Sequence, residues 1–211
     1  MRTITVDGHT FIPELLTESG WVIDAGARGF NLPKALAEIK PRFKYKDFNY
    51  NTYCLDIENF EKPEGDIVTV FKHAALMAKA GEVEAHYFGS GSGNFVKGIN
   101  EQPYDGPDRP CETKRVKAIT LQDIYSEIGT NIDLLKADIE GCEYEILLDL
   151  EPIPRMLSVE FHQHTVAKKH SEYIDRILVH LGKHYHMNLY VRDWPLYLFM
   201  DCLFIRKDLL K

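Results

Sequence analysis

The feature that most constrains the fold is the repeated alternation of short apolar runs with helical segments. The apolar runs predict strands, and the segments between them have the apolar spacing of amphipathic helices. The predicted strands are WVIDAG (21–26), TYCLDIE (52–58), IVTVFKHAAL (67–76), IDLLKADIEG (132–141), MLSVEFH (156–162) and, as an edge strand, VEAHYF (83–88). The predicted helices cover 31–40, 120–129, 142–150 and 167–182. This alternation favours an α/β fold with a mostly parallel sheet and helices on both faces.

Three other segments do not follow the alternation. Residues 185–206 contain two apolar runs and predict a terminal antiparallel pair. Residues 1–20 are expected to be a short N-terminal lead-in. Residues 89–110 begin with Gly-Ser-Gly-Ser-Gly and read as a loop, which is long enough to suggest a cover over a binding site. A length of 211 residues suits a single domain, 1–211.

Charge and composition exclude several classes of partner. The net charge of -7 gives no support for nucleic-acid binding. No apolar run is long enough to span a bilayer, and the N-terminus lacks the pattern of a secretory signal. The four cysteines form no C-x-x-C pair and read as reduced thiols. We therefore expect a cytoplasmic protein that uses neither a nucleic acid nor a membrane.

Candidate functional residues follow the ends of three predicted strands. These segments are Asp24 to Gly29 (DAGARG), Lys136 to Gly141 (KADIEG) and Glu160 to His162 (EFH). Ligands of open α/β sheets bind beyond the carboxyl ends of the strands. We therefore expect the three segments to meet at one site.

The first of these loops indicates the class of cofactor. Gly26 and Gly29 allow a sharp turn and a close approach of a ligand to the backbone, with Ala27 between them. In a nicotinamide enzyme, Asp24 would lie beside the pyrophosphate, where like charges repel. S-adenosylmethionine instead carries an ammonium and a sulfonium, which an aspartate suits better. A nicotinamide-dependent oxidoreductase remains the alternative, and a plain tight turn is the simplest explanation of D-x-G-x-x-G alone.

The second predicted strand offers an acid for the ribose of the cofactor. A carboxylate here can accept hydrogen bonds from both ribose hydroxyls. Asp56 is the expected contact, and Glu58 is the competing candidate.

Four blocks of the sequence together resemble the FkbM-like methyltransferases. The blocks are VIDAGARG, KHAALMAKAGEVEAHYF, TLQDIYSEIGTNIDLLKADIEGCEYEIL and SVEFH, and they extend over roughly residues 20 to 205. The most specific is K-x-D-x-E-G-x-E, which stands here as Lys136, Asp138, Glu140, Gly141 and Glu143. The chain departs from the family pattern at Gln122 in TLQDI and at Asp56, where many relatives have Glu followed by Pro.

The resemblance implies a fold, a reaction and further site residues. The fold is a Rossmann-like seven-stranded methyltransferase fold with an antiparallel last strand. The reaction is O-methylation of a hydroxyl on a sugar, a glycan or a natural product, so that residues 89–110 would cover the acceptor site. His73, Ala74 and Asp138 join the cofactor site. A non-catalytic module that binds the cofactor stays open, because fold does not determine function.

His162, Asp138 and Glu140 are the candidate catalytic residues. His162 could accept the acceptor's proton because an unperturbed imidazole titrates near neutral pH. Alternatively it is a structural histidine bonded to a carboxylate. Asp138 is expected near the methionine end of the cofactor or the acceptor oxygen, and the role of Glu140 is open. Glu143 is interpreted as an acid that interacts favourably with a helix N-terminus.

The same residues raise the question of a metal. Asp138, Glu140 and His162 could supply oxygen and imidazole ligands to a divalent cation. Carboxylates at strand ends also cluster without metals, and we expect none here. Activity that survives exhaustive chelation would exclude a metal.

Overall fold

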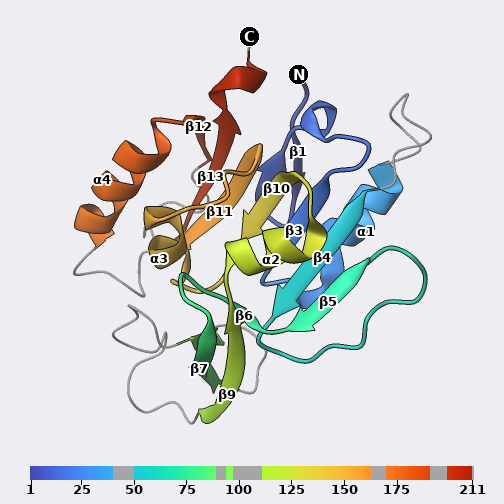
Figure 1. Cartoon of the computed structure of the whole chain (residues 1–211), viewed down its shortest axis with the longest axis vertical. Helices are drawn as coiled ribbons and strands as arrows, with labels where there is room; N and C mark the ends of the chain where they lie inside the picture. The colour runs from blue at the N-terminus through green and yellow to red at the C-terminus, as the bar shows by residue number, and fades with distance from the viewer. Residues whose placement is uncertain (40–49, 89–93, 97–110, 163–169, 191–198, 211) are drawn as a thin grey trace.

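A computed structural model describes residues 1–39, 50–88, 94–96, 111–162, 170–190 and 199–210 of the chain. The described residues form a seven-stranded main sheet in the order β12-β13-β11-β10-β3-β4-β5. In chain order its strands are β3 (Trp21–Ala25), β4 (Asn51–Asp56), β5 (Val70–His73), β10 (Ile132–Ala137), β11 (Met156–His162), β12 (Tyr185–Tyr190) and β13 (Phe199–Arg206). Figure 1 shows these strands as the central layer of the molecule.

The main sheet is mostly parallel, as the sequence predicts. Strands β11, β10, β3, β4 and β5 each run parallel to the next. Strand β13 is antiparallel to both β11 and β12, in the region where the sequence predicts an antiparallel pair. From β3 the chain builds outward through β4 and β5 and then crosses to β10 on the other side of β3. The strand order therefore reverses between β3 and β10.

The predicted helices are present, and each described end lies within three residues of its expected position. They are α1 (Asn31–Ile39), α2 (Leu121–Ile128), α3 (Glu143–Leu148) and α4 (His170–Leu181). Thr120 and Asp123 form a capping box at the start of α2, and Gly129 ends it in a left-handed conformation. Among the described residues, no helix has the length and apolar character needed to cross a membrane.

Alternate strand residues pack into two different cores. Ile23 of β3 contributes to a core with α2, α3 and α4, whereas Val22 contributes to a core with α1. Side chains of successive strand residues point to opposite faces. Helices therefore cover both faces of the sheet, which confirms this part of the predicted architecture.

The N-terminal segment is folded and helps to cover one of these faces, which corrects the expectation of a simple lead-in. It forms the hairpin of β1 (Ile4–Val6) and β2 (His9–Phe11), followed by the short helix η1 (Pro13–Leu15). Phe11 and Leu16 are buried in the same core as Leu36 of α1. This segment has few apolar side chains, and they are close together in the sequence. Its packing against the sheet could therefore not be predicted from the local sequence.

A smaller sheet lies beyond the end of the main sheet toward which β4 points (Figure 1). Within the described residues its order is β6-β9-β7-β8, with β6 (Ala75–Leu76), β7 (Gly81–Tyr87), β8 (Phe95–Val96) and β9 (Glu112–Ile119). The predicted strand 67–76 is therefore two strands, since β5 pairs with β4 and β6 pairs with β9. The predicted edge strand 83–88 belongs to β7, which lies between β9 and β8.

The predicted long loop, 89–110, is described only in part. Residues 89–93 and 97–110 lie outside the described residues, so the expected cover is not described there. The three residues between them contain β8, where Val96 pairs with Ala85 of β7.

Candidate functional site

The two loops at the reversal of strand order are in direct contact. The N–H of Asp138 donates a hydrogen bond of 3.1 Å to the carbonyl oxygen of Ala25. Gly26 has a φ of +78°, and a Cβ on it would lie 1.9 Å from the carbonyl oxygen of Asp138. A residue with a side chain cannot occupy this position without moving the backbone. Gly26 therefore allows the ends of β3 and β10 to meet.

A pocket opens beside this contact, at the carboxyl ends of the strands. It contains about 790 Å³ of space outside protein atoms, part of it open to solvent. The lining residues of the main sheet include Gly26, Leu55, Asp56 and Asp138, and those of the smaller sheet include Leu76 and Val96. The pocket thus lies where open α/β sheets bind their ligands.

Asp56 and Glu58 both line this pocket, so the choice between them stays open. Asp56 is 9 % exposed, and its Oδ1 accepts a 2.8 Å hydrogen bond from the N–H of Glu58. Burial raises the pKa of Asp56 to about 6, although the hydrogen bond from Glu58 opposes the shift. Glu58 accepts a hydrogen bond from the side chain of Asn94. The described part of the predicted loop therefore reaches the pocket.

Asp24 is paired with a lysine of the same chain, and its expected contact with the cofactor stays a prediction. Its Oδ1 lies 3.2 Å from the Nζ of Lys136, and both side chains are buried. Burial opposes the charge of Lys136, but the attraction of Asp24 and Asp138 outweighs it and holds the pKa above its usual value. Lys136 also donates a 2.6 Å hydrogen bond to the carbonyl oxygen of Gly26. Asp24 therefore holds Lys136 against the loop.

The other predicted cofactor residues lie at different places around the pocket. Ala27 is buried in a small core with Phe30, and its N–H bonds to Leu55. Gly29 has a φ of +71° and lines a second pocket, next to the first, that also contains Asp24. Ala74 lines the first pocket. His73 ends β5, and its Nε2 contacts the carbonyl oxygen of Ile57 at 2.8 Å. It lines a different pocket, between α2 and the smaller sheet.

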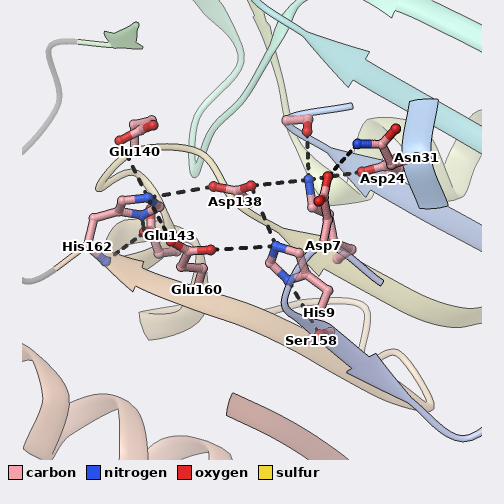
Figure 2. Close-up of polar contacts among 12 residues, drawn as sticks. Asp7, His9, Asp24, Asn31, Asp138, Glu140, Glu143, Ser158, Glu160 and His162 are labelled. Carbon is pink, nitrogen blue, oxygen red and sulfur yellow. Dashed lines mark hydrogen bonds and ion pairs between the residues drawn. The ribbon is translucent and has the colours of Figure 1, made fainter. Parts of the chain in front are cut away.

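A partly buried polar cluster extends from the second pocket to the end of β11 (Figure 2). Its members project from the main sheet at alternate positions, Lys136 and Asp138 from β10 and the loop after it, and Ser158, Glu160 and His162 from β11. Alternation places them on the face that the N-terminal hairpin covers. The three candidate catalytic residues, His162, Asp138 and Glu140, are therefore brought together, as the sequence predicts.

Three carboxylate oxygens surround the Nε2 of His162. Glu140 Oε2 lies 3.4 Å from it, and Asp138 Oδ1 lies 3.6 Å from it. Glu160 Oε1 lies 3.7 Å from the same nitrogen. Burial would raise the pKa of Asp138, but Lys136 and the two histidines of the cluster hold it well below its usual range. Asp138 is therefore ionised.

The other ring nitrogen of His162 is held by Glu143. This carboxylate has no solvent exposure and contacts the Nδ1 of His162. It also accepts hydrogen bonds from the backbone N–H of His162 at 3.1 Å and from that of Gly141 at 2.7 Å. The interpretation of Glu143 as an acid that serves the helix N-terminus is therefore incomplete. It is the first residue of α3, but its carboxylate bonds to β11 as well as to its own turn.

These contacts change the chemistry expected of His162. Burial alone would lower the pKa of His162, but the carboxylates of Glu143, Glu140 and Asp138 raise it to about 10. The raised pKa favours the imidazolium at neutral pH, so the role of His162 as a neutral base stays a prediction that these contacts do not favour. The alternative, a histidine bonded to a neighbouring carboxylate, describes the Nδ1 contact.

His9 is the member of the cluster that the sequence analysis missed. It begins β2 and is 2 % exposed. Its Nε2 lies 3.5 Å from Asp138 Oδ2 and 3.8 Å from Glu160 Oε2, and its Nδ1 lies 3.5 Å from Ser158 Oγ. Figure 2 shows Asp138 and Glu160 between the rings of His9 and His162. An isolated histidine before a short strand carries no local signal of such a contact.

The backbone of the loop after β10 is held in an unusual conformation. Glu140 has a φ of +54°, and Gly141, which follows it, has a φ of +100°. A positive φ at a residue other than glycine costs about 1–3 kcal/mol and occurs most often at functional sites. The conformation is maintained by the hydrogen bond from Gly141 to Glu143.

Comparison with known proteins identifies one family. The family model described as Methyltransferase FkbM domain matches residues 32–193. The matched range contains α1, the smaller sheet and the cluster residues of β10, α3 and β11, whereas His9 and the loop from Asp24 to Gly29 precede it. No curated protein and no solved structure matches the chain.

Proposed function

The chain belongs to the FkbM methyltransferase family, and on that premise we propose that it transfers a methyl group from S-adenosylmethionine to a hydroxyl of a sugar, glycan or natural-product acceptor. The reversal of strand order between β3 and β10, together with the antiparallel β13, supports a Rossmann-like methyltransferase arrangement. The proposal treats residues 1–211 as one domain.

The observation that carries the proposal is the pocket at the reversal of strand order. It has an acid at the end of β4, Asp56, on one side and the carboxylates of Asp138 and Glu140 on the other. A nucleoside whose ribose bonds to Asp56 would extend past Gly26 toward Asp138. We therefore expect the adenosine in the pocket and the charged methionine portion near the cluster.

The charge of the cluster favours this cofactor over a nicotinamide dinucleotide. Asp138, Glu140 and Glu160 provide three carboxylates, and Lys136 is already paired with Asp24. The ammonium and the sulfonium of S-adenosylmethionine are attracted to such a site, whereas a pyrophosphate is repelled. Asp24 does not itself add to this attraction, because Lys136 compensates its charge within the chain.

The reaction requires alignment and the removal of one proton. The bond between sulfur and the methyl carbon breaks as the acceptor oxygen bonds to that carbon, and the sulfur leaves as a neutral thioether. The acceptor hydroxyl loses its proton, for which we propose Glu140 as the base and Asp138 as the group that orients the hydroxyl. A positioned base contributes roughly 10²–10⁴-fold to the rate. The imidazolium of His162 holds both carboxylates in place.

Calorimetry with S-adenosylhomocysteine tests the cofactor assignment. We expect micromolar binding, no binding of NAD, and at least tenfold weaker binding by Asp56→Ala. Asp175→Ala, which removes an exposed acid on α4, is the matched control and should bind as the natural chain does. Binding of NAD instead would favour the oxidoreductase. If the protein binds neither ligand, it shares only the fold of the family and the proposed function is wrong.

Product analysis tests the type of acceptor. The protein is incubated with isotopically labelled S-adenosylmethionine and a panel of hydroxylated compounds that begins with sugars. The proposal expects a methyl ether, detected by mass spectrometry. A product methylated at nitrogen or carbon would contradict it. Cofactor binding with no product from any acceptor would favour the non-catalytic module.

A further inference from the structure

The polar cluster has the arrangement of ligands around a cation. One carboxylate oxygen from each of Asp138, Glu140 and Glu160 lies near the Nε2 of His162, and the potential ligand atoms of Asp138, Glu140 and His162 all lie within 4.8 Å of one another. The distances from that nitrogen are 3.4–3.7 Å. Ligands of a tetrahedral zinc-like ion, with bonds of about 2.0–2.2 Å, lie about 3.3–3.6 Å from one another. The distances from His162 Nε2 to Glu140 and Asp138, 3.4 and 3.6 Å, are close to this spacing.

The polar atoms of these side chains that would not bind the ion contact other residues, as is typical of metal sites. The Nδ1 of His162 contacts Glu143, and the second oxygen of Asp138 lies 3.5 Å from the Nζ of Lys136. Histidines that bind metals almost always bond through the other ring nitrogen to a carboxylate or carbonyl, which orients the ring. Glu143 provides this partner from a fully buried position.

A second, independent observation comes from His9 on the opposite side of the same carboxylates. Its Nε2 is buried and has no hydrogen-bond partner among the described residues, although it points toward Asp138 and Glu160. A buried polar atom without a partner costs about 1–3 kcal/mol. Together with Asp138 and Glu160, His9 also forms a second set of potential ligand atoms within 4.8 Å of one another. Its contacts with Asp138 and Glu160, at 3.5 and 3.8 Å, are ion-pair distances without a hydrogen bond, so this nitrogen can accept a further ligand.

We propose that this cluster binds a divalent transition-metal cation, which would replace the proton on the Nε2 of His162 and lie between that nitrogen, Asp138 and Glu140, with Glu160 and His9 on the other side of Asp138. Imidazole nitrogen suits zinc, copper, iron or nickel better than magnesium or calcium, which prefer oxygen ligands. The sequence alone favours no metal and points to only three of these five residues, Asp138, Glu140 and His162. His9 of β2 and Glu160 add two potential ligands, and with them the cluster favours a metal site.

The cation would lie beside the proposed acceptor site, since Asp138 and Glu140 also line the main pocket. There it would bind the acceptor oxygen and lower the pKa of its hydroxyl, whose proton would pass to the second oxygen of Glu140 as the acceptor oxygen attacks the methyl carbon. This catalytic consequence rests on the proposed function, whereas binding of the cation does not.

Direct binding of Co²⁺ and Zn²⁺ to the untagged, chelator-treated protein tests the proposal. We expect micromolar or tighter binding by calorimetry, visible absorption of bound Co²⁺, and at least tenfold weaker binding of Mg²⁺. Asp138→Asn, His162→Ala and His9→Gln should each weaken Co²⁺ binding by about 10- to 100-fold. His184→Ala, which removes an exposed histidine before β12, is the matched control and should change nothing.

Folding of each variant is checked by thermal unfolding without metal. If His162→Ala does not fold, Glu160→Gln and Asp138→Asn, which preserve the shape of the side chain, decide the question. The proposal is overturned if the natural chain binds no Co²⁺, or if the folded cluster variants bind it as well as His184→Ala does. S-adenosylhomocysteine binding is measured on the same metal-free samples, so failure of the metal site and failure of the proposed function give different results.

Discussion

Glu143 accepts hydrogen bonds from the backbone N–H and contacts the ring Nδ1 of His162, and it does so without any exposure to solvent. Because the same carboxylate accepts the N–H of Gly141, one side chain connects the turn after β10 to the end of β11. The position of the His162 ring is therefore determined by a residue that does not face the pocket.

The first prediction concerns this contact. Glu143→Gln should lower the free energy of unfolding by about 1–3 kcal/mol, because the amide N–H₂ offers a donor where the buried site needs an acceptor. It should lower kcat by roughly 10- to 100-fold through a displaced His162. The affinity for S-adenosylhomocysteine should change less than twofold. Glu145→Gln on the same helix is the control, and an equal loss of kcat there would contradict the positioning role.

The second prediction concerns the buried pair of Asp24 and Lys136. Lys136→Met should destabilise the protein by about 3–5 kcal/mol, because it leaves the carboxylate of Asp24 buried without its counter-charge. Adding Asp24→Asn should restore most of that loss. Chemical denaturation of the two single variants and the double variant gives the coupling energy. Simply additive losses would mean that the two side chains do not act as a pair.

The third prediction compares two glycines that both have positive φ angles. Gly26→Ala should cost about 2–4 kcal/mol of unfolding free energy, since the new Cβ meets the backbone oxygen of Asp138 at 1.9 Å. Gly29→Ala should cost only about 1–2 kcal/mol, because its nearest neighbour, Asn31, would be 3.4 Å away. Thermal unfolding of both variants checks the order. Equal losses would show that φ alone, and not the contact with Asp138, requires glycine at position 26.

The fourth prediction is a pH dependence at Asp56, whose pKa is raised to about 6. The ionised form accepts hydrogen bonds from both proposed ribose hydroxyls, and the protonated form has lost one acceptor. The affinity for S-adenosylhomocysteine should therefore fall as the pH is lowered from 7.5 to 5.5. Calorimetry across this range measures the change. In Asp56→Asn the affinity should be lower and nearly independent of pH, and a parallel fall in that variant would assign the titration to another group.

The raised pKa of Asp56 also makes the free energy of unfolding depend on pH. A carboxyl whose folded pKa exceeds its unfolded value of 3.8 contributes stability that is fully present below pH 3.8 and is lost as the pH rises through about 6. Asp56→Asn should therefore raise the free energy of unfolding by about 1–3 kcal/mol at pH 7.5 and have little effect near pH 4. A uniform effect at both values would contradict the assigned pKa.

The sequence predicted those elements whose signal is local. Thr120, Asp123 and Gly129 mark the ends of α2 within ten residues of chain, and MLSVEFH corresponds to β11 without error. Asp138, Glu140 and His162 were predicted to meet because all three follow parallel strands. By contrast, 67–76 was predicted as one strand because nothing in its composition marks Ala74, where the chain leaves one sheet for the other.

The sequence alone therefore determined the alternation of strands and helices, the acids at the strand ends and membership of a methyltransferase-like class, because each is written in neighbouring residues. Only the tertiary structure decided the partners of those acids. Asp24 pairs with Lys136, and His9 reaches Glu160 from the other end of the chain. The physical reason is that burial and pairing depend on which segments pack together, and this packing joins residues that are more than a hundred positions apart.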